Sequence, residues 1–417
     1  MENITIFPDR LRGSVTVPPS KSAAHRNIIS AALCSGVSKI YPACHSRDID
    51  ATIGCVKALG AEIEEKNGAF YIKGIDKTAA CGKRVTLDCD ESGSTLRFML
   101  PIAAALGVNA TFIGRGRLPE RTITPLTEIF KNMGVECSSD KLPLTIKGQL
   151  KMGEYPISGD ISSQYLTGLL FAISINGGSA RLTTPLQSAG YIDLTCSVLK
   201  SFGVEITCEN NIYRANGDFI CSEHITEGDW SQACFFLAAG ALGGEIEING
   251  LDINSTQGDK AALEHFKSLG ADITFKDGSI FVKKGNPCSA EIDCSQIPDM
   301  VPSLAVYSAV CEGKTRLFGA KRLRIKESDR IKTVVDGLRC MGIKVTELPD
   351  GMEIHGGTPF GGNVSGANDH RIVMAFSVLA AFSKGKTNIS GYKAIDKSYP
   401  TFFEDFKALG GKFECHL

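Results

Sequence analysis

The sequence predicts an α/β protein built from six copies of one unit, and two independent patterns carry this prediction. In the first pattern, a helix-like run closes with an apolar residue and glycine, and this pair recurs every 67 to 74 residues. The glycines of these pairs are Gly60, Gly134, Gly203, Gly270, Gly342 and Gly410. A repeat of this length is a small supersecondary module rather than one turn of a solenoid.

The second pattern is a set of strongly apolar runs that open with small or polar residues and stop at glycine. They begin near Ser22, Gly93, Ser163, Asp229, Asp299 and Asp369, at spacings of 66 to 71 residues. A small polar start followed by an apolar run is typical of a capped helix, and apolar residues around most of its surface indicate burial. Because the same period appears in an independent feature, six units are expected.

The elements between these landmarks define the unit. A short strand should follow the first helix, and a second helix should end at the apolar-glycine pair. A strand hairpin is expected next, because Asn67-Gly68, Asp277-Gly278 and Asp350-Gly351 stand where a tight turn is needed. Each unit therefore reads β-α-β-α-β-β.

The ends of the chain predict how the units divide into domains. The sixth copy stops one strand short, whereas residues 4–7 (ITIF) form a strand without a unit of its own. The simplest explanation is that the N-terminal strand completes the last unit. We therefore expect two domains of three units each, one comprising residues 1–18 and 226–417 and the other comprising residues 19–225.

Composition excludes several classes of protein. A formal net charge of −1 gives no overall attraction to nucleic acid or to an anionic membrane surface. The 15 cysteines form no Cys-x-x-Cys pair or zinc-type cluster, so we expect reduced thiols and no metal. The start MENITIFPDRLRG lacks the layout of a signal peptide, and no apolar run reaches the ~18 residues that span a bilayer. A soluble, cytoplasmic protein is expected.

The repeat also predicts where chemistry occurs. Units wound alike place the N-termini of their helices at the same end, so we expect the helix N-termini of both domains to face a shared cleft. Each N-terminus carries about half a positive charge and suits anions. Residues expected at the first-helix N-termini are Lys21, Ser22, Arg26, Ser94, Arg97, Ser162, Ser163, Gln164, Asp229, Asp299, Asp369, His370 and Arg371. Those expected at the second-helix N-termini are Arg47, Arg121, Ser188, Tyr191, Asp259, Glu327, Arg330 and Lys397.

Not all of these residues indicate function. Serine and aspartate at helix starts usually act only as caps, and we assign Asp229 and Asp259 to that role. Capping does not explain six cations, each of which the helix dipole disfavours by about 0.3–1 kcal/mol. They are Lys21, Arg26, Arg121, Arg330, Arg371 and Lys397. We interpret these placements as a site where a bound polyanion compensates the positive charge.

Several motifs carry a specific resemblance. The segments SKSAAHR, RIKESDR, GANDHR and DKSYP, with SSQYLTGLL and SAGYIDLT between them, resemble the 5-enolpyruvylshikimate-3-phosphate (EPSP) synthase family over essentially the whole chain. The resemblance implies the enolpyruvyl-transferase fold, with two three-unit domains joined by a two-stranded hinge. It also implies transfer of the enolpyruvyl group of phosphoenolpyruvate to the 5-hydroxyl of shikimate 3-phosphate, with release of phosphate. This is a step of the shikimate pathway to chorismate and aromatic amino acids. Members use no metal or organic cofactor and are expected to be monomers.

The resemblance also implies roles for individual residues. Shikimate 3-phosphate is expected to bind Lys21, Ser22, Arg26, Ser162, Ser163, Gln164, Ser188, Tyr191, Asp299 and Lys326. Phosphoenolpyruvate is expected to bind Lys21, Gly93, Arg121, Gln164, Arg330, His370, Arg371 and Lys397. Glu327 matches the acid/base at the methylene carbon, and Asp299 matches the carboxylate that hydrogen-bonds the attacking hydroxyl. Lys21 is the candidate proton partner of Asp299, and which of the two takes the hydroxyl proton stays open.

The chain departs from the family pattern at a few positions. Glu91 and Ser94 replace the more usual Asn and Thr beside Gly93, and Arg322 stands where Asn is common. Gly93 matches the glycine that leaves room for phosphoenolpyruvate and for the inhibitor glyphosate, so we expect sensitivity to glyphosate.

Two alternatives were weighed against this interpretation. The sister transferase acting on UDP-N-acetylglucosamine typically uses a loop cysteine, and the loop IGRGRLPER has none. A catalytically inactive anion-binding relative would have no need for Glu327 and Asp299.

Overall fold

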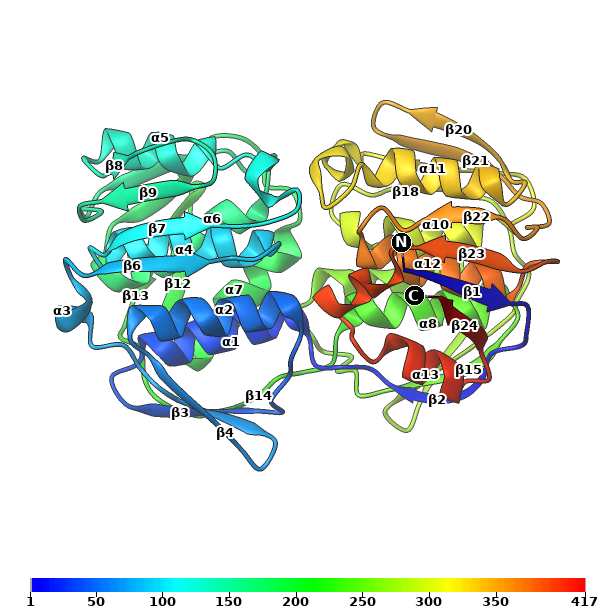
Figure 1. Cartoon of the computed structure of the whole chain (residues 1–417), viewed down its shortest axis with the longest axis horizontal. Helices are drawn as coiled ribbons and strands as arrows, with labels where there is room; N and C mark the ends of the chain where they lie inside the picture. The colour runs from blue at the N-terminus through cyan, green and yellow to red at the C-terminus, as the bar shows by residue number, and fades with distance from the viewer. Residues whose placement is uncertain (1, 417) are drawn as a thin grey trace. The chain divides into compact units, whose positions relative to one another are not determined.

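The computed structural model of the chain describes residues 2–416 and divides into two compact domains (Figure 1). The N-terminal domain is Pro19–Thr226, and the C-terminal domain combines the residues up to Pro18 with those from Glu227 onward. The described residues form six four-stranded sheets, three in each domain. The predicted fold, α/β with six repeated units and three per domain, is confirmed.

The N-terminal domain contains the first three units. The first consists of β14 (Glu223–Ile225), α1 (Lys21–Leu33), β3 (Val37–Tyr41), α2 (Arg47–Leu59), β4 (Glu62–Lys66) and β5 (Ala69–Lys73). The second consists of β6 (Arg84–Asp88), α4 (Gly93–Ala105), β7 (Asn109–Ile113), η1 (Leu118–Glu120), α5 (Thr124–Asn132), β8 (Glu136–Cys137) and β9 (Leu144–Lys147), and the short α3 (Lys77–Ala80) precedes it. The third consists of β10 (Glu154–Ile157), α6 (Ser163–Asn176), β11 (Ser179–Leu182), α7 (Ala189–Ser201), β12 (Glu205–Glu209) and β13 (Ile212–Asn216).

The C-terminal domain contains the other three units. The fourth consists of β2 (Arg12–Thr16), α8 (Trp230–Leu242), β15 (Glu245–Asn249), η2 (Gly258–Ala261), α9 (Ala262–Ser268), β16 (Asp272–Lys276) and β17 (Ser279–Lys283). The fifth consists of β18 (Glu291–Asp293), η3 (Pro298–Met300), α10 (Val301–Ser308), β19 (Lys314–Phe318), η4 (Lys321–Ile325), α11 (Arg330–Cys340), β20 (Lys344–Leu348) and β21 (Gly351–His355). The sixth consists of β22 (Asn363–Ser365), α12 (His370–Ala381), β23 (Thr387–Ser390), η5 (Tyr392–Lys397), α13 (Phe402–Ala408), β24 (Lys412–His416) and β1 (Asn3–Phe7).

All six sheets share one strand order, which the third unit illustrates. Strand β10 pairs in parallel with β11, β11 pairs antiparallel with β13, and β13 pairs antiparallel with β12. A parallel pair requires a long crossover, and the first helix of the unit supplies it. In the chain, the first helix of every unit starts just after the end of a strand.

Three sheets take a strand from a distant part of the chain. Strand β1 lies between β23 and β24 and supplies the strand that the sixth unit lacks. Strand β2 pairs with β15, in register from Arg12 opposite Glu245, and β14 pairs with β3. The chain thus exchanges first strands between the first and fourth units, next to the two points where it passes between the domains.

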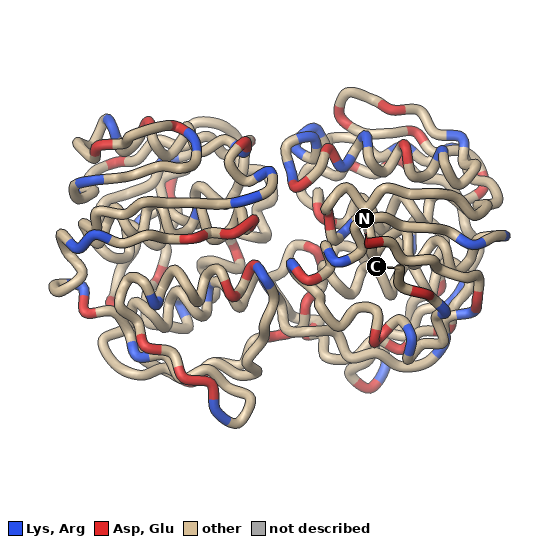
Figure 2. The backbone as a smooth tube through the Cα atoms, in the orientation of Figure 1, with Lys and Arg blue, Asp and Glu red and all other residues tan. Residues whose placement is uncertain are grey.

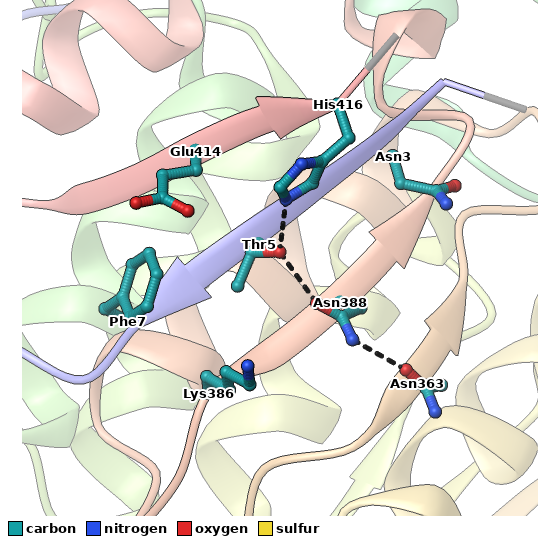
Figure 3. A pocket seen from close by; sticks show the side chains of 8 residues that line it. All are labelled: Asn3, Thr5, Phe7, Asn363, Lys386, Asn388, Glu414 and His416. Atoms are coloured by element: carbon teal, nitrogen blue, oxygen red, sulfur yellow. Dashed lines mark hydrogen bonds between the residues drawn. The ribbon is translucent and has the colours of Figure 1, made fainter.

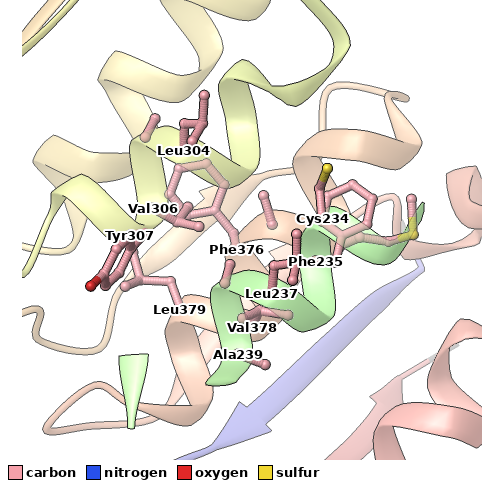
Figure 4. Close-up of a cluster of buried hydrophobic side chains, with 14 of the residues drawn as sticks. Cys234, Phe235, Leu237, Ala239, Leu304, Val306, Tyr307, Phe376, Val378 and Leu379 are labelled. Carbon is pink, nitrogen blue, oxygen red and sulfur yellow. The ribbon is translucent and has the colours of Figure 1, made fainter. Parts of the chain in front are cut away.

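Each domain has its own core beneath its sheets. In the C-terminal domain, Phe235 of α8, Tyr307 of α10 and Phe376 of α12 lie in one cluster of buried side chains (Figure 4). In the N-terminal domain, α1, α4 and α6 supply the equivalent apolar residues. The expectation that the first helices are apolar on nearly all sides and buried is therefore confirmed.

The hairpins depend on turn residues as expected, with one correction. Asn67-Gly68 and Asp277-Gly278 form two-residue turns in which both residues have positive φ, as the tight I′ turn requires. In the fifth unit, however, Leu348 pairs with Gly351, so the turn residues are Pro349-Asp350 and not Asp350-Gly351. Proline fixes a negative φ at the first turn position and therefore shifts the turn by one residue.

Candidate active site

The predicted site residues form one set in each domain, called here the N-terminal half-site and the C-terminal half-site. The N-terminal half-site begins at Lys21, the first residue of α1. Lys21 follows the N-cap Ser20, whose side chain accepts from the backbone N–H of Ala23. The Nζ of Lys21 donates to Oδ2 of Asp48 at 2.7 Å, and both side chains are largely buried. Asp48 lies in the first turn of α2 and therefore fixes the direction of Lys21. Sequence reasoning missed Asp48, although its place at a second-helix start next to Arg47 was a usable signal.

Arg26 lies one turn further along α1 and is buried. Its guanidinium donates to Oγ1 of Thr195 at 2.8 Å and to the carbonyl oxygens of Ser22 and Tyr191 at 2.7 and 3.1 Å. Burial lowers the pKa of Arg26 to about 10, so the side chain stays charged at neutral pH. These contacts bring Ser22, Arg26 and Tyr191 together, three of the residues expected to bind shikimate 3-phosphate.

Gln164 is held by two neighbours on α4. Its Oε1 accepts from Nη1 of Arg97 at 2.9 Å, and its Nε2 donates to Oγ of Ser94 at 2.9 Å. The two helices approach closely because Gly168 has no side chain: a Cβ there would lie 2.3 Å from the carbonyl oxygen of Arg97. Arg97 thus fixes which end of the Gln164 amide donates and which end accepts.

The serines of this half-site lie at two further helix starts. Ser162 caps α6 by accepting from the backbone N–H of Gln164, and Ser163 is the first residue of that helix. Ser188 precedes α7 with φ of 57° and ψ of 48°, a left-handed conformation that serine rarely adopts. Backbone strain of this kind gathers at functional sites. Ser188 is buried and lies within one helical turn of Tyr191.

Arg121 lies against Gly93, the first residue of α4. A Cβ at Gly93 would be 2.5 Å from Nη1 and 2.7 Å from Cζ of Arg121. The absence of a side chain at Gly93 therefore allows the Arg121 guanidinium to occupy this position. The loop before Gly93 is acidic, and Arg47 contacts Asp90 at 2.8 Å and Glu91 at 3.5 Å.

The C-terminal half-site is organised around Arg330, the first residue of α11. Its side chain is 1% exposed and contacts three carboxylates. Nε donates to Asp369 at 2.8 Å, Nη1 to Asp299 at 2.8 Å, and Nη2 to Glu327 at 2.5 Å. Burial alone would lower the pKa of Arg330, but the carboxylates outweigh it and raise the pKa.

Asp299 connects Arg330 to the other cations of this half-site. Its carboxylate lies 3.5 Å from Nζ of Lys326 and 3.5 Å from Nη2 of Arg371. Burial lowers the pKa of Lys326 to about 8, although Asp299 acts in the opposite direction. The cluster places two candidate proton-transfer groups, Asp299 and Glu327, on either side of one buried cation.

Asp369 and the adjacent chain complete this half-site. Asp369 caps α12 through the backbone N–H of Arg371 and accepts from Ser328 as well as Arg330. His370 is the first residue of α12 and is buried. The Nζ of Lys397 donates to the carbonyl oxygen of Asn368 at 2.7 Å, which brings the DKSYP motif next to the GANDHR motif.

Four positions differ from the sequence-based expectation. Asp299, expected at the start of a first helix, lies in η3, and α10 begins at Val301 without a side-chain cap. Arg121 lies three residues before α5, and Lys397 ends η5, five residues before α13, so neither starts an α-helix. Short 3₁₀ segments precede the second helices here and shift their starts along the chain. Asp259 lies inside η2 and accepts from Ser231 rather than capping a helix. Burial and the nearby Asp299 raise its pKa to about 6.

Three of the six cations that were expected to need a bound polyanion already have counter-charges in the protein. Lys21, Arg330 and Arg371 are balanced by the carboxylates of Asp48, Asp299, Glu327 and Asp369, so these cations do not depend on a ligand for a counter-charge. Basic and acidic residues are interspersed along both domains (Figure 2). Three of the six cations are therefore paired with carboxylates in the protein itself.

A separate hollow lies on the outer face of the last sheet (Figure 3). It has a volume of about 400 Å³ and is lined by residues of β1, β22, β23 and β24 and by Lys386. Thr5 donates to Asn388 at 2.7 Å and contacts Nε2 of His416 at 2.8 Å. None of its lining residues belongs to the predicted site.

Other features were tested on the described part of the chain. All 15 cysteines are free thiols. Within residues 2–416, no group of three or more His, Cys, Asp or Glu side chains is arranged to hold a metal ion. No helix in that range combines the length and the apolar character needed to cross a membrane.

The chain resembles known proteins along its whole length. The family model described as EPSP synthase (3-phosphoshikimate 1-carboxyvinyltransferase) matches residues 7–406. The 3-phosphoshikimate 1-carboxyvinyltransferase of Clostridium novyi (strain NT) is 42% identical over 428 residues, covering 99% of this chain and 98% of the relative. That of Clostridium kluyveri is also 42% identical, over 427 residues, covering 99% of each chain.

Solved structures agree with these matches. The enolpyruvyl transferase NikO from Streptomyces tendae has a TM-score of 0.79 at 16% identity and covers 99% of both chains, which shows a shared fold. EPSP synthase from Acinetobacter baumannii has a TM-score of 0.83 at 27% identity and covers 100% of both chains. The chain therefore has the fold of the enolpyruvyl transferases. Within that class, it belongs to the EPSP synthase family, as its motifs predicted.

Proposed function

We propose that this protein is a 3-phosphoshikimate 1-carboxyvinyltransferase of the shikimate pathway. It transfers the enolpyruvyl group of phosphoenolpyruvate to the 5-hydroxyl of shikimate 3-phosphate and releases inorganic phosphate. The observation that carries the proposal is the family match over residues 7–406, within which both expected carboxylates are present. The alternative acting on UDP-N-acetylglucosamine is not favoured, because the relatives named above are 3-phosphoshikimate 1-carboxyvinyltransferases.

The N-terminal half-site is suited to shikimate 3-phosphate. Ser22, Arg26, Ser162 and Ser163 offer a cation, hydroxyl groups and helix N-termini for the phosphate. Ser188 and Tyr191 supply further polar contacts for the ring, and Gln164 is pre-oriented by Arg97. Arg121 and Gly93 contribute to the phosphoenolpyruvate site from this domain. Lys21 and Lys326 are proposed to contact both substrates, and Asp299 contacts shikimate 3-phosphate.

The C-terminal half-site supplies cations and proton-transfer groups. Arg330, His370, Arg371 and Lys397 are proposed to hold the carboxylate and phosphate of phosphoenolpyruvate, since guanidinium groups pair with such anions in fixed geometry. Binding would require Arg330 and Arg371 to exchange part of their contact with Asp299 and Glu327 for contact with the ligand. The released carboxylates then face the reacting atoms.

The reaction proceeds by addition and elimination. Glu327 gives a proton to the methylene carbon while the 5-hydroxyl oxygen forms a bond to the adjacent carbon. Asp299, with Lys21, accepts the hydroxyl proton. In the elimination, the bond to the phosphate oxygen breaks, and Glu327 takes back a proton from the methyl carbon. The tetrahedral intermediate is bound without a covalent link, because no step needs a protein nucleophile. We further propose a monomeric cytoplasmic enzyme that needs no metal or organic cofactor.

A coupled phosphate-release assay tests this function. Purified protein should release phosphate only when shikimate 3-phosphate and phosphoenolpyruvate are both present. Turnover with UDP-N-acetylglucosamine would instead select the sister activity. Binding of both substrates without turnover would identify an inactive relative.

Gly93→Ala tests the phosphoenolpyruvate contact. The new methyl group would lie 2.5 Å from Nη1 of Arg121, so the guanidinium must move. We expect the KM for phosphoenolpyruvate to rise about tenfold or more, because overpacking costs about 1–3 kcal/mol. The wild-type enzyme should be inhibited by glyphosate, and the variant should lose that sensitivity. Gly54→Ala in α2 is the matched control, since its Cβ would meet no atom within 4 Å and should leave both constants unchanged.

The lowered pKa of Lys326 predicts that substrate binding depends on pH. Its pKa is lowered to about 8 in the ligand-free protein, so the ammonium loses its proton as the pH rises through 8. A bound anion favours the charged form and raises this pKa. Affinity for shikimate 3-phosphate should therefore fall between pH 7 and 9, and binding above pH 8 should take up a proton. Calorimetry in two buffers of different ionisation enthalpy measures this uptake. Lys326→Arg, which keeps its charge, should abolish the proton uptake, and an uptake that persists would contradict the assignment.

A further inference from the structure

One arginine outside the site joins the middle of a loop that carries two site residues to the end of that loop and to a neighbouring hairpin. The loop runs from the end of β19 through η4 to the start of α11 and includes Lys326 and Glu327. Arg324 lies in η4, and its half-buried guanidinium makes four hydrogen bonds. No contact of Arg324 with Lys326, Glu327 or Arg330 is among these bonds.

The four bonds join the loop to the hairpin that follows α11. Nη1 donates to Oδ2 of Asp329 at 3.0 Å and to Oε1 of Glu347 at 2.8 Å. Nη2 donates to the carbonyl oxygen of Leu348 at 2.7 Å, and Nε donates to that of Pro349 at 3.0 Å. Every nitrogen of the guanidinium is therefore used, in a planar pattern that a lysine cannot reproduce.

Asp329 connects the hydrogen bonds of Arg324 to the helix that carries Arg330. Its other carboxylate oxygen, Oδ1, caps α11 by accepting from the backbone N–H of Lys332 at 3.0 Å. Arg324 thus links the turn at Leu348 and Pro349 to the first turn of the helix that begins with Arg330. The start of the loop is attached to the same turn, because Asp350 accepts from the backbone N–H groups of Gly319 and Ala320.

The loop also has other anchors, because Leu323 is buried in the core and Ser328 is buried and donates to Asp369. Arg322 donates to the carbonyl oxygen of Ser295 at 2.6 Å, and Ile325 is exposed. Lys326 and Glu327 face the opposite way, toward Asp299 and Arg330. Leu323 holds the middle of the loop to the core, and the hydrogen bonds of Arg324 join it to the N-cap of α11 and to the hairpin.

We propose that Arg324 is a positioning residue that fixes the loop carrying Lys326 and Glu327, and that turnover depends on it although it contacts no substrate. This proposal rests on the proposed function of Glu327. Displacement of a reacting group by about 1 Å costs about 100-fold in rate. Loss of Arg324 should therefore lower kcat far more than it changes the KM for shikimate 3-phosphate, because most contacts to that substrate come from the other domain.

The test compares Arg324→Gln and Arg324→Lys with the control Arg339→Gln. Arg339 lies on α11 and donates to the carbonyl oxygen of Val345 on β20, so it supports the same hairpin without touching the loop. We expect Arg324→Gln to lower kcat by about 30- to 100-fold, with partial recovery in Arg324→Lys and wild-type kcat in Arg339→Gln. Similar losses in Arg324→Gln and Arg339→Gln would overturn the proposal, because they would indicate a general effect on stability.

A second measurement does not depend on activity. Hydrogen exchange of the backbone amides in residues 321–329 should become faster in Arg324→Gln and should stay at the wild-type rate in Arg339→Gln. Unchanged exchange in this segment overturns the proposal even if kcat falls. If the wild-type protein shows no turnover with the two substrates, the proposed function fails, while the exchange result still decides whether Arg324 holds the loop.

Discussion

Arg330→Met should destabilise the C-terminal domain by about 3–5 kcal/mol and abolish turnover. The wild-type guanidinium is buried and neutralises part of the charge of Asp299, Glu327 and Asp369. Methionine has a similar volume but no charge, so three neighbouring carboxylates lose the cation they share, although Asp299 keeps Lys326 and Arg371 nearby. Asp369 is itself 0% exposed, which makes its loss of a partner especially costly.

Urea denaturation followed by tryptophan fluorescence measures this loss. Trp230 is the single tryptophan of the chain and is buried at the start of α8, so its emission reports on the C-terminal domain. Lys332→Met is the matched control, because Lys332 lies on the same helix and pairs with Asp336 at the exposed surface. Its effect should stay within about 1 kcal/mol. A loss of stability in Arg330→Met no larger than that of the control would show that the carboxylates do not need this cation.

The repeat made most of the fold predictable. Five of the six first helices begin at or next to the expected small or polar residue, because the cap and the apolar run are both local signals. The exception is α10, which begins at Val301 after a 3₁₀ segment that contains Asp299. The exchange of β2 and β14 between units was not predicted. Strands of five and three residues carry no local signal for a distant partner, and their partners are more than 180 residues away in the chain.

The second helices were predicted less accurately. Arg47 and Arg330 begin α2 and α11, whereas Arg121 and Lys397 lie in or next to 3₁₀ segments that precede α5 and α13. A 3₁₀ turn uses the same polar residues as a helix cap, so the sequence does not separate them. The dipole argument for Arg121 and Lys397 was wrong for this reason, although both residues still lie beside other expected site residues.

The partners of the site residues were harder to predict than the residues themselves. Arg26, Gln164 and Arg330 were expected from their places in the motifs, but Thr195, Arg97 and Asp369 hold them, and these lie on other helices. Such contacts depend on packing, for example the close approach of α6 to α4 that Gly168 permits. Asp369 was identified only as a helix start, although it is both a cap and the buried partner of Arg330.

The caps also differ between the two domains in a way that fits the proposed chemistry. In the N-terminal domain α1, α4 and α6 are capped by serine and have no acidic residue in their first turn. In the C-terminal domain α8, α11 and α12 are capped by aspartate. The first arrangement suits binding of a phosphate, whereas the second fixes cations and carboxylates in a network suited to proton transfer.

Glu327→Gln should lower kcat by about 10²- to 10⁴-fold and leave the structure of the half-site intact. Glutamine has the volume of glutamate, and its amide oxygen can accept the hydrogen bond that Nη2 of Arg330 donates to Oε2. The amide cannot give a proton to the methylene carbon or take one back. Binding of shikimate 3-phosphate and the Trp230 emission should therefore be unchanged while turnover is lost.

Isotope exchange separates this role from a merely structural one. When the wild-type enzyme runs in deuterium oxide, Glu327 should deliver deuterium to the methylene carbon, and label should appear in the enolpyruvyl product. The variant should lose this incorporation together with kcat. Glu353→Gln is the control, because Glu353 lies on β21, pairs with Lys314 and has no contact with the proposed substrates. Near-wild-type turnover in Glu327→Gln would remove this residue from the acid/base role and leave Asp299 as the remaining carboxylate in the cluster able to move a proton.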